Sequence, residues 1–173
     1  TTYIGVEHVN SGYTGHNTRI DGPEHGESFV FRKEEVEKVL IHEIIHSLRF
    51  DFHNYPEILK EELYEIFSIP KNKMNKLLLG EAYVETWACL INCIFVSYLT
   101  GIDCNELFRK EIIFSLFQSA KVLNFFNFSC LKDCGEESFV NEENKNFFQH
   151  SAIFSYYIVK SMLLYNLEDF LEM

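Results

Sequence analysis

A His-Glu-x-x-His stretch within an apolar, helical pattern constrains this chain more than any other feature. Its histidines, His42 and His46, are four residues apart, and isoleucines and leucines surround them. Side chains at this spacing project from the same face of an α-helix. Two imidazole nitrogens placed in this way can reach one tetrahedral zinc ion at about 2.0–2.1 Å. Glu43 follows the first histidine, where a carboxylate can take a proton from water on the metal.

A zinc site of this kind needs a third protein ligand, and the sequence offers three ways to supply it. The pattern His-Glu-x-x-His-x-x-Gly-x-x-His fails, because Arg49 replaces its glycine and Phe52 its last histidine. Glu65 and Glu81 both lie on predicted downstream helices. We favour Glu81, because it begins a long apolar helix that must pack centrally. Glu85, one turn later on the same face, can accept the second N–H of a metal-bound imidazole.

Together these two stretches resemble the gluzincins, the zinc peptidases that include thermolysin and neprilysin. The resemblance covers mainly residues 36–90 and implies a zincin-like fold that hydrolyses peptide bonds. The resemblance also suggests that residues 28–31 form the substrate-aligning edge strand. The resemblance implies one Zn²⁺ ion and the following roles: His42, His46 and Glu81 as ligands, Glu43 as the group that activates water, and Glu85, where thermolysin-like enzymes carry aspartate, as the support of a histidine.

The same resemblance implies a downstream histidine or tyrosine that stabilises the oxyanion of the reaction. The last predicted helix offers His150 and Tyr157, which are seven residues apart and share a helix face. Tyr156 is expected to point elsewhere. The choice between His150 and Tyr157 stays open at this point.

Composition narrows the classes of partner. The formal net charge of −11 leaves no basic surface for nucleic acid or an anionic membrane. The longest apolar run, residues 87–99, is short for a bilayer span and contains Asn92, so we expect a core helix and no membrane span. The predicted partner is a peptide or protein substrate.

Cysteine usage favours a reducing, intracellular location in the cytoplasm. Five cysteines cannot form a complete set of internal disulfides. Cys89 and Cys93 lie at helical spacing in an apolar run and are expected to be buried thiols. No signal peptide is visible in the sequence.

The secondary-structure pattern predicts an α+β fold that is predominantly helical, in a single domain spanning residues 1–173. A small N-terminal ribbon of strands at residues 3–9 and 28–31, joined by a glycine-rich loop at 10–27, precedes a zincin-like helical body. The helices are predicted at residues 33–50, 56–67, 71–79, 81–99, 105–126 and 146–165, with a polar connection at 127–143.

The sequence therefore predicts a zinc-dependent peptidase. Two alternatives remain: a zinc hydrolase of non-peptide amide bonds, and a catalytically inactive interaction module that keeps zinc for structure. Glu43 argues against the inactive module, because a purely structural zinc site has no use for that carboxylate and usually closes its fourth position with a protein ligand.

Overall fold

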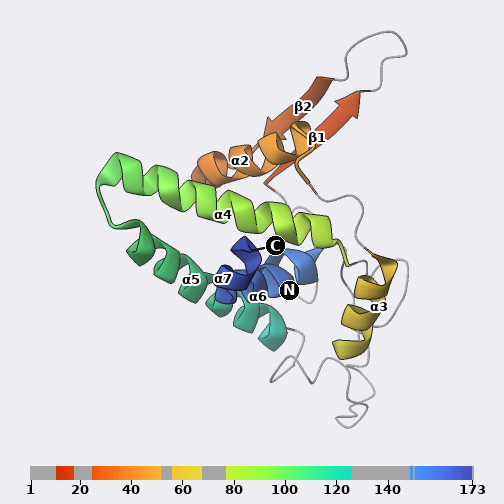
Figure 1. Cartoon of the computed structure of the whole chain (residues 1–173). Helices are drawn as coiled ribbons and strands as arrows, with labels where there is room; N and C mark the ends of the chain where they lie inside the picture. The colour runs from red at the N-terminus through yellow and green to blue at the C-terminus, as the bar shows by residue number, and fades with distance from the viewer. Residues whose placement is uncertain are drawn as a thin grey trace.

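The computed structural model describes residues 11–17, 25–51, 56–67, 77–125, 149 and 151–172. In these residues a two-stranded antiparallel sheet precedes a series of helices, which confirms the α+β, predominantly helical prediction (Figure 1). Three predicted segments lie outside the described residues: the strand at 3–9, most of the short helix at 71–79, and the connection at 127–143. The single domain over the whole chain stays a prediction.

The sheet is a hairpin of β1 (Gly12–Asn17) and β2 (His25–Val30). The prediction that residues 10–27 form a loop is wrong, because β1 lies within them. The glycines of β1 weaken its local strand propensity, but pairing with β2 supplies its hydrogen bonds. Tyr13 and Phe29 stack across the strands at 4.9 Å between ring centroids, and both are exposed. The alternate residues of β1 face the next helix.

That helix is α2 (Val36–Ser47), which follows a 3-10 turn, η1 (Lys33–Glu35). It approaches the hairpin closely at Gly12, where a Cβ would lie 2.7 Å from Cγ1 of Val39 and 3.0 Å from Oε1 of Glu43. Only glycine fits this contact without displacing its neighbours. The hairpin and the His-Glu-x-x-His helix are therefore packed directly against each other.

Helix α2 ends three residues before the predicted boundary at residue 50, in a left-handed turn. The backbone N–H of Arg49 donates to the carbonyl of His46 at 3.0 Å, and the N–H of Phe50 donates to that of Ile45 at 3.0 Å. Arg49 has a φ of 57°, in the left-handed region that favours glycine. The turn reverses the chain, so that the residue after Phe50 comes back toward the helix.

Helix α4 (Leu79–Thr100) runs through the middle of the molecule, with the hairpin and α2 on one side of it (Figure 1). It packs against α2 on that side, and against helices from the C-terminal half of the chain on the other. Its bounds are close to the predicted 81–99, and it ends at Gly101, whose φ is 72°. Helix α3 (Glu57–Ile66) lies beside the start of α4.

In the described residues after Gly101, the chain forms α5 (Cys104–Phe125), a π-helix η3 (Phe154–Val159), α6 (Lys160–Tyr165) and α7 (Leu167–Leu171). The bounds of α5 match the predicted 105–126 closely. The single helix predicted at 146–165 is wrong in two respects. Residues 151–152 are not helical, and the first turns after them are π-helical rather than α-helical. Helix α7 was not predicted.

Two hydrophobic clusters hold these helices together. The larger cluster joins the C-terminal end of α3 and the start of α4 to α5 and η3. The smaller cluster joins the middle of α4 to α6 and α7. The buried members of the larger cluster are Phe67, Leu77, Ala82, Val122, Ile153, Phe154, Ile158 and Val159. Those of the smaller cluster are Leu90, Leu164 and Phe170.

Among the described helices, α4 is long and apolar enough to cross a membrane, with 22 residues and a mean hydropathy of 1.4. It packs against α2, α5, α6 and η3, as the core helix of a folded body does. Length and composition alone do not distinguish the two situations, so no membrane span is established. Cys89 and Cys93 are buried on this helix, as predicted.

Candidate metal centre

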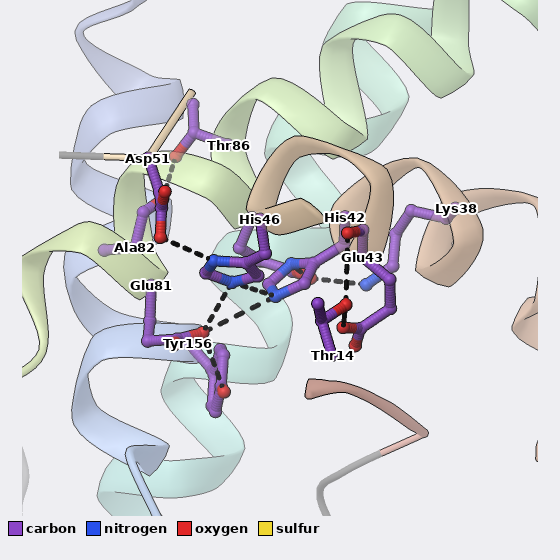
Figure 2. Close-up of polar contacts among 11 residues, drawn as sticks. Thr14, Lys38, His42, Glu43, His46, Asp51, Glu81, Ala82, Thr86 and Tyr156 are labelled. Atoms are coloured by element: carbon purple, nitrogen blue, oxygen red, sulfur yellow. Dashed lines mark hydrogen bonds and ion pairs between the residues drawn. The ribbon is translucent and has the colours of Figure 1, made fainter. Parts of the chain in front are cut away.

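Three side-chain atoms from α2 and α4 converge on one point (Figure 2). Nε2 of His42 lies 3.1 Å from Nε2 of His46. Oε2 of Glu81 lies 3.5 Å from the first nitrogen and 3.4 Å from the second. His42, His46 and Glu81 together could hold a metal ion. The sequence offered Glu65 and Glu81 as third ligand, and the structure brings Glu81 to the two histidines. Glu65, on α3, is not part of this group.

The Nδ1 atom of each imidazole contacts a carboxylate other than that of Glu81. Nδ1 of His42 lies 3.0 Å from Oε2 of Glu85, and Nδ1 of His46 lies 2.8 Å from Oδ2 of Asp51. With each Nδ1–H donated to a carboxylate, both Nε2 atoms present a lone pair toward the oxygen of Glu81. Three electron-rich atoms at this spacing repel one another unless a proton or a metal ion lies between them.

In the metal-free chain, protons on the histidines can meet this requirement. Burial alone would lower the pKa of His42, but its contacts with Glu81 and Glu85 outweigh burial and raise it from 6.5 to about 9. Burial also works against the charged form of His46, whose pKa is raised by Glu81 and Asp51. Burial would raise the pKa of Glu81, yet the two histidines hold it well below its usual range. The site therefore favours positive charge at its centre.

Glu85 lies between two cationic groups. Its Oε1 accepts a hydrogen bond from the ammonium of Lys38, one helical turn before His42 on α2. Burial would raise the pKa of Glu85, but Lys38 and His42 hold it well below its usual range. The carboxylate is therefore charged, and both of its oxygens are engaged.

Glu43 is buried, and its carboxylate is held by the hairpin. The hydroxyl of Thr14, on β1, lies 2.6 Å from Oε2 of Glu43 and 3.1 Å from its backbone carbonyl oxygen. Figure 2 shows the Glu43 side chain turned toward Thr14. Glu43 lines the same cavity as His42 and Tyr156.

Tyr156 contacts the centre, although the sequence suggested that it points elsewhere. Its hydroxyl donates a hydrogen bond to Oε2 of Glu81 at 3.0 Å. The expectation was wrong because it assumed α-helical spacing, whereas the residue lies in the π-helix η3. Burial and the charge of Glu81 raise the pKa of Tyr156 far above its ordinary value, so the hydroxyl keeps its proton.

The two residues predicted to stabilise the oxyanion have different outcomes. His150 lies outside the described residues. Tyr157 is half-buried against the larger hydrophobic cluster and has no side-chain hydrogen bond to another described residue. Tyr156, rather than Tyr157, therefore lies beside the candidate metal ligands and contacts Glu81.

Sequence reasoning missed Asp51. It follows His46 by five residues, so an ideal helix would not place the two side chains together. The left-handed turn at Arg49 brings Asp51 back to the histidine. The sequence did show an acidic residue just beyond a helix whose last turn carries a histidine. This pattern is also common in proteins that bind no metal, so it did not single out Asp51.

No family model, curated protein or solved structure matches this chain.

Proposed function

We propose that this protein is a zinc-dependent metallopeptidase of the His-Glu-x-x-His type, with Glu81 as third ligand. One observation carries the proposal: two imidazole nitrogens and one carboxylate oxygen converge, each imidazole being fixed from behind by a second carboxylate. A carboxylate behind each ligand histidine is typical of metal sites, where it sets the tautomer and raises ligand basicity.

The spacing of the donor atoms supports a small tetrahedral ion. For metal–ligand bonds of about 2.0–2.1 Å, neighbouring ligand atoms of a tetrahedron are about 3.3 Å apart. The three separations in this site are 3.1, 3.4 and 3.5 Å. Two imidazoles with one carboxylate form a ligand set known from catalytic zinc sites, in which the fourth position is left for water or substrate.

When bound, zinc would polarise the scissile carbonyl and acidify a water molecule. The chain's own residues supply the remaining functions. Glu43 would accept a proton from the attacking water and later donate it to the leaving amine. Thr14 would hold that carboxylate in place. Tyr156, whose hydroxyl keeps its proton, would turn its hydrogen bond from Glu81 to the carbonyl oxygen of the substrate as negative charge develops on that oxygen.

The test of this proposal combines metal content with hydrolysis. Wild-type protein should contain one zinc ion per chain and cleave members of a peptide library. Glu81→Ala should lose most of the zinc, whereas Glu65→Ala, the matched control on α3, should retain it. Glu43→Gln should keep zinc and lose hydrolysis by roughly 10²–10⁴-fold, the usual contribution of a general base. Full activity in Glu43→Gln would refute the role of this residue.

Acyl-amide substrates, assayed beside the peptides, test the alternative hydrolase. Cleavage of acyl amides without cleavage of any peptide would replace the peptidase proposal. Zinc retention without hydrolysis of either class would favour the inactive module.

A further inference from the structure

A cavity of about 360 Å³ adjoins the candidate metal centre. It lies among α2, α4, α5 and η3, and His42, Glu43 and Tyr156 form part of its wall. The wall also contains a lysine, Lys160, which begins α6. Nothing in the proposed hydrolysis uses this lysine.

Lys160 is a buried cation with few partners. Its side chain is 7% exposed, and its ammonium lies 3.8 Å from Oε1 of Glu111 and 4.0 Å from Sγ of Cys89. The same oxygen of Glu111 already accepts a hydrogen bond from Ser115 at 3.1 Å. Among the described residues, no oxygen lies within hydrogen-bonding distance of the Lys160 ammonium. A buried ammonium with three donors requires acceptors, which a ligand or water must supply.

Further donors line the same cavity. The side-chain amides of Asn92 and Gln118 and the hydroxyl of Tyr157 all belong to its wall. None of these three side chains has a hydrogen bond to another described residue. The cavity therefore presents several unused N–H and O–H groups around one ammonium.

Of the six carboxylates in the wall, Glu34 and Glu37 are exposed to solvent, and the other four have partners within the chain. Lys38 and His42 occupy both oxygens of Glu85. Thr14 contacts Glu43, and Ser11 donates to Glu35 at 2.7 Å. Lys38 has its partner within the chain, whereas Lys160 lacks a close one. A ligand group that accepts hydrogen bonds and carries negative charge would supply Lys160 with the close partner that it lacks.

The position of Lys160 suits a group close to the scissile bond. It follows Tyr156 by four residues across the end of the π-helix η3, and both side chains line the cavity. Each residue of an extended peptide covers about 3.3–3.6 Å, so one or two residues of a bound peptide span about 3–7 Å of this cavity. A peptide held beside Tyr156 can therefore place an adjacent group near the ammonium.

We propose that this cavity binds a carboxylate of the substrate through Lys160, so that the preferred substrates carry a carboxylate within one or two residues of the scissile bond. This inference rests on the proposed peptidase function and narrows its substrate class. The carboxylate is supplied either by an acidic side chain or by the C-terminus of the peptide.

The test compares peptides that differ only in this group. One pair carries Glu or Gln next to the scissile bond, and a second pair ends in a free carboxylate or an amide. In wild type, kcat/KM should favour the carboxylate by about tenfold or more in at least one pair, the effect of one charge-assisted hydrogen bond. The pair that responds identifies the source of the carboxylate.

Lys160→Met should abolish this preference, and Lys160→Arg should retain part of it. The matched control is Lys110→Met, because Lys110 is exposed on α5 and paired with Glu106. Cleavage of both members of each pair at equal rates would overturn the carboxylate proposal and leave the peptidase function standing.

A binding measurement keeps the proposal testable if no peptide is cleaved. Glutarate and its uncharged analogue glutaramide are titrated into the protein, with and without zinc, and followed by NMR shifts of residues in the cavity wall. Tighter binding of glutarate that disappears in folded Lys160→Met would support the carboxylate site even if the peptidase function fails. Equal binding of the two probes would overturn it.

Discussion

Glu85 accepts hydrogen bonds from two donors at once, and its replacement by glutamine tests whether both contacts matter. One oxygen accepts from Nδ1 of His42 at 3.0 Å, and the other accepts from the Lys38 ammonium. Glutamine has a similar shape but only one oxygen, so its NH₂ group must face either Lys38 or His42. Both are donors. Glu85 is 8% exposed, so water has little access to compensate for the mismatch.

We expect Glu85→Gln to lower the free energy of unfolding of the metal-free chain by about 1–3 kcal/mol, the cost of leaving one buried donor without an acceptor. Zinc affinity should fall by roughly 10–100-fold, because His42 is held less firmly in its metal-binding orientation. Urea unfolding in the presence of a chelator measures the first quantity. Competition with a chromophoric zinc chelator measures the second.

The double variant with Lys38→Gln and Glu85→Gln is the matched control. The new carbonyl at position 38 can accept from the NH₂ of the glutamine at position 85, whose own oxygen then remains available to His42. We expect the double variant to recover much of both losses. Unchanged stability and zinc affinity in Glu85→Gln would refute the reasoning, and failure of the double variant to recover would show that the donor mismatch is not the cause.

Three further predictions concern the hairpin, the general base and pH. Gly12→Ala would place a Cβ 2.7 Å from a carbonyl oxygen of β2 and should lower the free energy of unfolding, measured with urea, by about 1–3 kcal/mol. Gly15→Ala is the control, because its nearest contact is at 4.0 Å and it should change this free energy little. Equal effects of the two variants would contradict the close approach at Gly12. Thr14→Val removes the contact of 2.6 Å to Glu43 and should reduce kcat about tenfold at unchanged zinc content, so an unaltered kcat would remove the positioning role. The pKa of His42 is raised from 6.5 to about 9, so its contribution to the stability of the metal-free chain should be complete below pH 6.5 and lost as pH rises through 9. Urea unfolding from pH 6 to pH 10 measures this loss. Stability that increases over that range would contradict the prediction.

The sequence predicts the parts of the site that depend on local spacing. Histidines four residues apart share a helix face wherever the helix forms, and α2 does form around them. The start of α4 at Leu79, two residues before the predicted Glu81, and its end at Thr100, before Gly101, follow from the long apolar run and the glycine after it. The pattern alone therefore pointed to Glu81 as the third member of the candidate group with His42 and His46.

The remaining partners depend on departures from regular geometry. Asp51 reaches His46 through a left-handed residue that is arginine rather than the usual glycine. Thr14 reaches Glu43 because β1 pairs with a strand beyond a glycine-rich stretch, and such pairing leaves little trace in local composition. Tyr156 contacts Glu81 from a π-helix, which α-helical spacing does not describe.

The π-helix makes the position of Tyr156 sensitive to chain length as well as to side-chain chemistry. A π-turn accommodates one residue more than an α-turn between hydrogen-bonded groups, as in the bond from the N–H of Lys160 to the carbonyl of Ser155. Deleting a single residue between Phe154 and Val159 would let the segment close as an α-helix. Residues on the two sides of the deletion would then rotate relative to each other by about 100°. The length of this one segment therefore determines whether tyrosine or another side chain faces His42, His46 and Glu81, while these three residues themselves stay in place on α2 and α4.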